Sequence, residues 1–419
     1  MNRKMGLLVA CGLAASLGGV ASAQSDANRA LSADIAADAA SRTSYQGGSE
    51  GFAVPSSTGN STLNIGGLVS FRTNLNFGDD DRGEDNDFVW GFALPHEQIW
   101  FYGNLFNPDF TYMIEAEFEG VNSSGTGVGS SGSGDFNLRD AWGRYQFENG
   151  AYVQAGQFKV DYSAETLTED QYLLFAERSF VDEYFSADYT QGVRVGYEGE
   201  TFHIVGNIYD GPWGRNLDWT DPAEADIAFG GRFDWLFSGQ WVFDDHTSWR
   251  GSEFSGRLGG AVHWATYGET GFGAPADVDI IYYTIDVGVE GDGWNAFAAF
   301  LGDHIDADGA DEVDNFGFVI QGGIFITDNT EIAGRVDFLF RDDDAFSGDE
   351  DQYFLTVGVN HYFFAESHAA TAYANLVWGF QDTGDLIGSD MHYRGNTANG
   401  LLGNDDDEVA LIFGFDALF

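Results

Sequence analysis

Cysteine and lysine are almost absent from this chain of 419 residues. Cys11 is its one cysteine, and Lys159 is its only lysine after residue 4. A single cysteine cannot form a disulfide framework within the chain. Lysine and arginine together number 18 against 67 acidic residues, which gives a formal net charge of -49. This balance excludes nucleic acid as a partner, because phosphate recognition needs clustered basic side chains.

Long hydrophobic runs are also missing, since no stretch reaches the ~18 apolar residues that a transmembrane helix needs. In contrast, aromatic residues make up 16% of the chain, and 57 residues are glycine. The aromatic content excludes a disordered acidic tail, which would be poor in such residues. Together, glycine, aromatics and aspartate indicate an all-β chain with many turns.

The N-terminus has the pattern of an export signal. Arg3 and Lys4 precede an apolar stretch over residues 7–20, and Ala21-Ser22-Ala23 forms a small-residue cleavage site. We therefore predict a signal peptide at residues 1–23. The alternatives are a buried helix and a lipoprotein signal ending at Cys11, before which the apolar stretch is too short.

Residues 24–61 are predicted to form a short helix and a linker before the main domain. Residues 26–45 are rich in alanine, and Leu31, Ile35 and Ala39 lie four residues apart, as on one helix face. Residues 47–61 are mostly glycine, serine and threonine, which favours a linker.

From Thr62 to Phe419 the hydrophobic period changes to two, which is typical of β-strands. We predict sixteen strands, at residues 62–77, 89–106, 109–120, 134–147, 151–161, 189–198, 201–210, 225–237, 253–268, 277–290, 293–304, 314–327, 330–342, 351–364, 368–381 and 407–419.

The connections between these strands alternate between short and long. The short ones include residues 106–109, 198–200, 291–292 and 328–329, whereas the long ones, such as 121–133, 211–224 and 381–407, are acidic or rich in glycine and serine. Only the stretch 238–252 is long where a short turn is expected. This alternation predicts an all-β transmembrane antiparallel barrel over residues 62–419 in the outer membrane, with short periplasmic turns and long extracellular loops.

Each predicted strand has two different faces. In residues 110–118, the aromatic and aliphatic side chains occupy the even positions, while Glu115 and Glu117 point the other way. A soluble sandwich would bury the apolar face. A sixteen-stranded barrel turns this face toward the membrane lipid and turns the carboxylates into a wet lumen.

The last strand ends in an aromatic residue. Val409, Leu411, Phe413, Phe415 and Phe419 share one face, together with Ala417. This arrangement resembles the C-terminal signature of bacterial outer-membrane barrels, which is read by the barrel-insertion machinery. Phe419 is therefore our candidate assembly signal.

No motif indicates an enzyme or a cofactor. Residues 127–132 match G-x-G-x-x-G, but a serine and glycine run and then a strand follow, so a loop is favoured over a dinucleotide site. A hydrolase on the barrel wall remains an alternative. Four acidic runs, at residues 79–81, 303–314, 342–344 and 405–408, fall in long loops. They form either a solvated surface or sites for loop-bound Ca²⁺.

Five short motifs carry a resemblance to a known family. They are Phe101-Tyr102-Gly103-Asn104-Leu105, Asp140-Ala141 with Tyr145, Gly156-Gln157-Phe158-Lys159, Glu165-Thr166-Leu167-Thr168 and Phe175-Ala176-Glu177-Arg178-Ser179. The segment resembles the phosphate-selective porin O/P family. The resemblance implies a sixteen-stranded homotrimeric channel for small hydrophilic solutes, in which a long loop, here about residues 162–188, folds inward and narrows the pore.

The chain departs from this family in its charge, because the family uses arginine ladders and lysine clusters. The strand before Phe101 carries Leu94-Pro95-His96-Glu97-Gln98 in place of arginines. We therefore predict a porin with weak cation preference or none, and the alternative is a non-conducting structural or adhesive barrel. The predicted constriction consists of the basic residues Arg139, Arg144, Lys159, Arg178 and Arg194 and the facing acids Glu165 and Glu177.

Overall fold

The computed structural model describes residues 52–56, 60–78, 88–119, 135–221, 223–268, 277–342, 351–381, 399–402 and 407–419. The predicted signal peptide, the predicted helix at 26–45 and the glycine-rich motif at 127–132 lie outside these ranges. Within them, no helix is long and apolar enough to cross a membrane.

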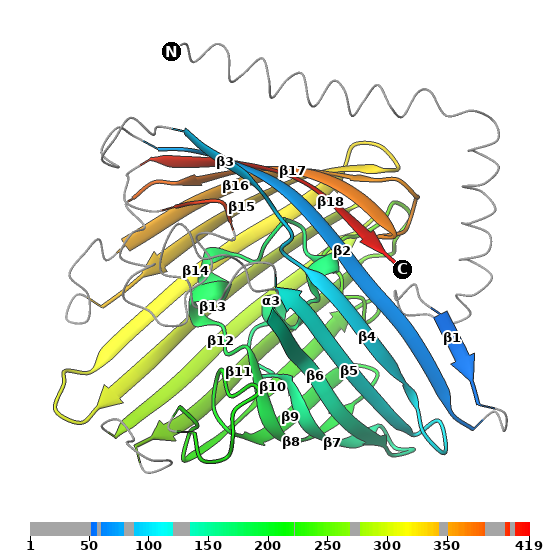
Figure 1. Ribbon diagram of the computed structural model, residues 1–419, viewed down its shortest axis with the longest axis vertical. Coiled ribbons are helices and arrows are strands. Elements are labelled where there is room, and N and C mark those ends of the chain that lie inside the picture. The colour runs from blue at the N-terminus through cyan, green and yellow to red at the C-terminus, as the bar shows by residue number, and fades with distance from the viewer. Residues whose placement is uncertain are drawn as a thin grey trace.

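The strands form one closed antiparallel ring, tilted in the view of Figure 1. They are β2 (Thr62–Phe77), β3 (Phe88–Ala93), β4 (Glu97–Asn104), β5 (Phe110–Glu119), β6 (Asp135–Gln146), β7 (Ala151–Lys159), β8 (Tyr189–Glu198), β9 (Phe202–Tyr209), β10 (Ile227–Ser238), β11 (Ser255–Tyr267), β12 (Val278–Gly291), β13 (Trp294–Ala307), β14 (Val313–Phe325), β15 (Thr330–Phe340), β16 (Asp351–Tyr362), β17 (Ala370–Gly379) and β18 (Glu408–Leu418). Each strand pairs with its sequence neighbour, and β18 pairs with β2 to close the ring. Because β3 and β4 both pair with β2, they form one interrupted strand, and the predicted 16-stranded barrel is confirmed.

The interruption between β3 and β4 differs from the prediction of one continuous strand at 89–106. It falls at residues 94–96 and contains Pro95. Proline has no backbone N–H, so it cannot donate to the ladder on β2. The break leaves His96 inside the barrel, where its ring contacts Glu117 and Glu177.

A short strand, β1 (Phe52–Pro55), lies within the segment predicted as a linker. It pairs antiparallel with residues 62–65 of β2. The pairing of β18 with β2 ends at Leu68, so β1 occupies the part of the β2 edge that β18 leaves free. Figure 1 shows β1 beside the lower end of β2. Glycine and serine around this strand hid its pattern in the sequence.

The wall has an apolar outer face and a polar inner face. On β5, Ile114 is 47% exposed and Phe118 is 45% exposed, whereas Glu115 and Glu117 are buried inside. The predicted orientation of this strand is therefore confirmed. Exposed aromatic and aliphatic side chains continue around the outside on most strands, as expected for a surface that faces lipid.

The core lies inside the ring, around the segment between β7 and β8. This segment contains α3 (Ala164–Leu167), the 3₁₀-helix η1 (Asp170–Tyr172) and α4 (Phe180–Phe185), and α3 is visible within the barrel in Figure 1. The Phe180 ring stacks on Phe354 of β16 with 3.7 Å between ring centroids. Val181 and Phe185 belong to the same buried cluster, which includes Leu301 and Leu339 of the wall.

The seam between β18 and β2 requires a glycine. An added Cβ at Gly67 would lie 2.4 Å from the Phe419 ring and 2.8 Å from the carbonyl oxygen of Gln98. Phe419 and Gly67 also exchange two backbone hydrogen bonds, of 3.0 and 3.1 Å. A side chain at residue 67 therefore disturbs the contact that closes the barrel.

We expect Gly67→Ala to destabilise the barrel by about 1–3 kcal/mol through overpacking. The measurement is the temperature at which the unheated form converts to the unfolded form on a gel. Gly334→Ala is the control, because no atom lies within 4 Å of an added Cβ there. Adding Phe419→Ala should restore only part of the loss, since the Gln98 carbonyl remains in place. Equal transition temperatures for Gly67→Ala and Gly334→Ala would contradict a steric role for residue 67 at the seam.

Candidate functional site

The segment between β7 and β8, residues 160–188, crosses the lumen as two short helices with serine caps. We call it the lumen loop. Ser163 caps α3 by accepting a hydrogen bond from the Glu165 N–H, and Ser179 caps α4 by accepting one from the Asp182 N–H. The Glu165 carboxylate accepts hydrogen bonds from the N–H and the hydroxyl of Ser179, at 2.9 and 2.6 Å. Local capping thus ties the two halves of the loop together.

Residues 174–178 attach the lumen loop to the far wall. The Arg72 guanidinium of β2 donates to the Glu177 carboxylate and to the Ala176 carbonyl, and its Nε donates to the Tyr373 hydroxyl at 2.9 Å. Arg335 of β15 donates to the Glu177 carbonyl at 2.8 Å. The amides of Asn360 and Asn375 bind the Leu174 carbonyl and the Ala176 N–H. The motif at 175–179 is therefore the attachment point of the loop.

A second set of ion pairs joins the loop to β5 and β6. Arg139 Nη1 lies 2.7 Å from Asp170 Oδ2 and 3.1 Å from Glu117 Oε1. Arg178 Nη1 lies 2.5 Å from the other oxygen of Asp170. His96 contacts both Glu117 and Glu177, at 3.1 and 3.2 Å. It thereby joins the contacts on β5 and β6 to those at residues 174–178 in one network. The three carboxylates that His96 and Arg139 contact here, Glu117, Asp170 and Glu177, are all buried.

A β-bulge explains how Arg139 enters this network. The register of β5 and β6 shifts between Ile114 and Ala116, so that Arg139 and Asp140 lie opposite Glu115. Gln157 of β7 then holds this stretch, because its amide donates to the carbonyls of Leu138 and Arg139 at 2.6 and 2.7 Å.

The glycine of the Gly156–Lys159 motif has a steric role. Gly156 has φ +132°, and an added Cβ would lie 2.1 Å from the Ala141 carbonyl oxygen. Only glycine permits this approach of β7 to the Asp140-Ala141 motif of β6. The family-like motifs therefore contribute to the loop attachment both from the wall, on β6 and β7, and from the loop itself, at residues 175–179.

The structure brings together five of the seven residues predicted for the constriction. Arg139, Arg178, Glu165 and Glu177 lie in or beside the loop network, and Lys159 contacts Glu169 at 3.0 Å. The charged groups of Lys159 and Arg139 both make cation–π contacts with the ring of Tyr189. The other two lie apart from this network: Arg194 pairs with Asp161 at 3.0 Å, and Arg144 pairs with Glu198 at 2.6 Å.

Sequence reasoning missed Arg72, His96, Glu117, Asp170 and Tyr189 as members of the site. The period of two places Arg72 on the inner face of the first strand, and this signal was available. Its partner Glu177 lies 105 positions later, and no spacing rule connects residues so far apart.

One group of three potential metal ligands exists among the described residues: His96, Glu117 and Asp170. Arg139 already contacts both carboxylates, at 3.1 and 2.7 Å. The guanidinium supplies the positive charge that a cation would bring, so this group is an ion-pair cluster. Of the acidic runs, residues 79–81, 343–344 and 405–406 lie outside the described residues.

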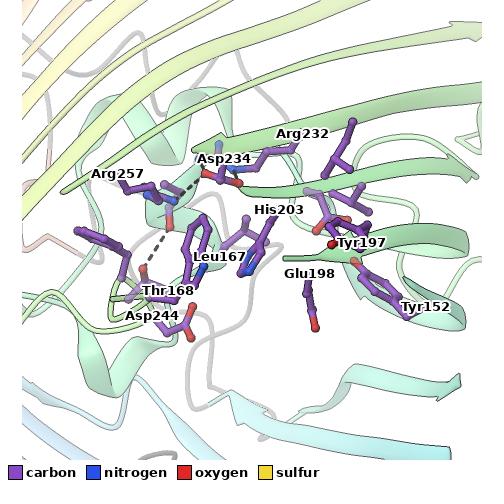
Figure 2. Close-up of a pocket in the computed structure, with 16 residues that line it drawn as sticks. Tyr152, Leu167, Thr168, Tyr197, Glu198, His203, Arg232, Asp234, Asp244 and Arg257 are labelled. Carbon is purple, nitrogen blue, oxygen red and sulfur yellow. Dashed lines mark hydrogen bonds and ion pairs between the residues drawn. The ribbon is translucent and has the colours of Figure 1, made fainter. Parts of the chain in front are cut away.

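A water-accessible chamber lies beside the lumen loop, between residues 161–168 and the inner face of β7–β11. Figure 2 shows its lining, which includes both aromatic rings and charged groups. Its volume is ≈ 190 Å³, which is room for several water molecules or a small hydrated ion. The chamber lining includes Tyr152, Tyr197, Trp241, Phe243, Arg232 and Arg257.

A closed ring of this kind, apolar outside and charged inside, defines the class of outer-membrane porin barrels. The profile of the family described as phosphate-selective porin O and P matches residues 64–285, more than half of the chain. The chain belongs to this family. It forms a channel for passive diffusion in the bacterial outer membrane.

Solved structures of porins have the same fold at low sequence identity. OmpT of Vibrio cholerae is 14% identical with a TM-score of 0.57, covering 88% of this chain and 100% of its own. An anion-selective porin from Comamonas acidovorans is 13% identical with a TM-score of 0.58, covering 86% and 100%. The channel DcaP of Acinetobacter baumannii is 15% identical with a TM-score of 0.55, covering 87% and 99%. No curated protein sequence matches the chain.

Loop attachment can be measured through the Arg72–Glu177 pair. Removing one partner of a buried ion pair costs about 3–5 kcal/mol, because the other charge stays buried. We therefore expect Arg72→Met and Glu177→Met each to destabilise the barrel strongly, and the double variant to be less destabilised than the sum. Unfolding by urea in detergent, followed by tryptophan fluorescence, gives the coupling energy.

The matched control is the pair Arg144–Glu198, in which the carboxylate side chain is 41% exposed. A pair this exposed contributes about 1 kcal/mol or less. Equal coupling energies in the two cycles would contradict an anchoring role for Arg72.

The lumen loop should also depend on pH through Glu165. Burial, with Asp182 nearby, raises the pKa of Glu165 from 4.5 to about 7. The folded state thus holds this proton more tightly, so the stabilisation is full below pH 4.5 and is lost as the pH rises toward 7. We expect Glu165→Gln to lose less stability than the wild type between pH 5 and pH 8, measured as the change in unfolding temperature. Identical pH slopes for the two proteins would contradict this role.

Proposed function

We propose that this porin passes small hydrophilic solutes and ions with weak cation preference or none, and that it has no phosphate-selective site. The observation that carries the proposal is the pairing of the basic side chains. Eleven lysine and arginine residues in the described ranges have a nitrogen within 3.8 Å of a carboxylate oxygen.

Anion selection in a channel needs positive charge that is available to the ion. Here the two arginines of the chamber, Arg232 and Arg257, are shared between Asp234 and Asp286 at distances of 2.6–3.0 Å. Arg139 and Arg178 are likewise held by the carboxylates of the loop network. A phosphate ion would have to displace these partners, which argues against selectivity for phosphate.

The residues of the loop network fit an anchoring role better than a role as selectivity groups. Arg72, Arg139 and Glu177 are at most 6% exposed, so they contact protein rather than water. A charge buried in this way fixes the loop, while the groups that line open water act on passing ions. This division leaves the chamber of Figure 2 as the site where solutes meet charged side chains.

Two further features belong to the proposal. A trimeric form is recorded for OmpT of Vibrio cholerae, which is 15% identical with a TM-score of 0.52, and we extend a homotrimer to this chain on that likeness. Phe419 is proposed as the signal for the insertion machinery, supported by its exposed ring at the barrel seam. Reduced amounts of assembled Phe419→Ala barrel, with unchanged conductance, would support this role.

Ion selectivity is measured as the reversal potential under a KCl gradient in planar bilayers. We expect a potential near zero or of cation sign, and no block of the chloride current by added phosphate. Lys159→Gln should shift the preference toward cations, because Glu169, 35% exposed, loses its partner. Arg250→Gln is the control, since Arg250 is 45% exposed in the connection between β10 and β11.

Two outcomes would contradict the proposal. A strongly anion-selective wild type that phosphate blocks would show that the paired arginines still form an anion site. A folded barrel without measurable conductance would instead favour the non-conducting structural barrel.

A further inference from the structure

One turn at the periplasmic end departs from the rule of short turns. Residues 239–254 join β10 to β11 at the same end as the short turns at 199–201, 292–293 and 326–329. We call this segment the crossbar. Joining the two strands does not require this length, because β10 and β11 are adjacent antiparallel strands that a two-residue turn can join.

The crossbar is fixed near its start on the β8–β9 side of the barrel. The Trp241 indole N–H donates to the carbonyls of Gly199 and Glu200, at 3.2 and 3.1 Å. Its ring stacks on His203 with 3.7 Å between centroids. These contacts hold the first half of the crossbar against the wall that lines the chamber.

Its second half reaches the opposite side of the ring. Asp245 Oδ2 lies 2.8 Å from His368 Nε2, in the turn between β16 and β17. The Thr247 and Tyr362 hydroxyls are 3.0 Å apart, and the Trp249 ring packs edge-on against Tyr362. Since β16 and β17 lie half a ring away from β8 and β9, the crossbar spans the periplasmic mouth.

The crossbar also contacts the lumen loop inside the barrel. The His246 N–H donates to the Tyr172 carbonyl at 3.0 Å. The His246 ring binds the Gln321 amide at 2.9 Å and stacks on Phe297. Thr247 and Ser248 are buried, so this contact is packed rather than wet. The chamber of Figure 2 therefore lies between the lumen loop, the crossbar and the wall of β7–β11.

Charge pairing within the chamber singles out Asp244. Asp161 pairs with Arg194, Glu198 with Arg144, and Asp234 with Arg232 and Arg257. Asp244 lies on the crossbar, lines the chamber and is exposed to its water. Among the described residues, no side chain forms a hydrogen bond or ion pair with it. Arg257 acts on Asp244 only at longer range, and Arg257 is already bound by Asp234 and Asp286.

We propose that residues 239–254 are a fixed bar across the periplasmic mouth and that solutes pass through the chamber beside it, where Asp244 sets the charge preference. The inference rests on the proposed function, because it assigns the weak cation preference to one carboxylate. It makes the crossbar, together with the lumen loop, a determinant of pore size.

Asp244→Lys tests the charge assignment. Reversing the charge of Asp244 in the proposed path should lower the ratio of potassium to chloride permeability roughly threefold. Glu200→Lys is the matched control, since it makes the same charge change on an exposed residue of a turn at the same mouth. Equal reversal potentials for Asp244→Lys and the wild type would overturn the assignment.

Thiol modification tests the path itself. The chain has one cysteine, Cys11, far from the barrel in sequence. We expect a quaternary ammonium thiosulfonate to reduce the current through Asp244→Cys and to leave the wild type and Glu200→Cys unchanged. An unchanged current through Asp244→Cys, with modification shown by mass spectrometry, would place the path elsewhere.

Replacing residues 240–253 with Asn-Gly tests the bar. The conductance should rise roughly twofold or more, because the mouth is no longer divided. Heat-modifiable migration of the variant shows that the barrel still folds. A folded variant with unchanged conductance would overturn the role of the crossbar.

These results separate the inference from the proposed function. A strongly anion-selective wild type contradicts the proposed selectivity, whereas the Asp244→Lys shift and the conductance of the crossbar variant still decide the inference. If the wild type does not conduct, a conducting crossbar variant supports the bar, and a folded variant that remains closed overturns it.

Discussion

The structure depends on the requirement that every backbone N–H and C=O group within the membrane be paired. Only a closed ring of strands meets this requirement for a β protein, because lipid offers no hydrogen bonds to a free edge. The contact of β18 with β2 completes the ring, and β1 continues the pairing where β18 ends. Glycine at residue 67 allows the final aromatic ring to cover this seam.

Closure has an electrostatic consequence for the inside of the barrel. The lipid-facing side of each strand must be apolar, so charged side chains of the wall point into the lumen. The acidic excess of this chain makes carboxylates common there, and the few arginines are bound by them. Arg72, Arg139 and Arg335 hold the lumen loop in place, and this use of the arginines removes them from the water that ions cross. The same ion pairs thus stabilise the loop and weaken any attraction for anions.

Much of the barrel could be predicted from the sequence, because a strand with one face in lipid repeats its pattern every two residues. The sixteen strands, the outward face of β5 and the unusual length of the 239–254 turn all follow from local pattern. The break at Pro95 was local as well, but the aromatic residues on both sides concealed it. The strand at residues 52–55 was missed because its partner, rather than its own composition, makes it a strand.

The sequence by itself determined the fold class, the family and the residue types available inside the channel, since these depend on periodicity and short motifs. Tertiary structure decided which charges meet. Arg72 reaches Glu177 and Arg139 reaches Asp170 only because the lumen loop crosses the barrel, whereas Arg144 and Arg194 bind other carboxylates. The path of residues 239–254 across the mouth was likewise set by contacts with distant turns. Pairing between side chains far apart in sequence leaves no local pattern, which is the physical reason that only the folded barrel reveals it.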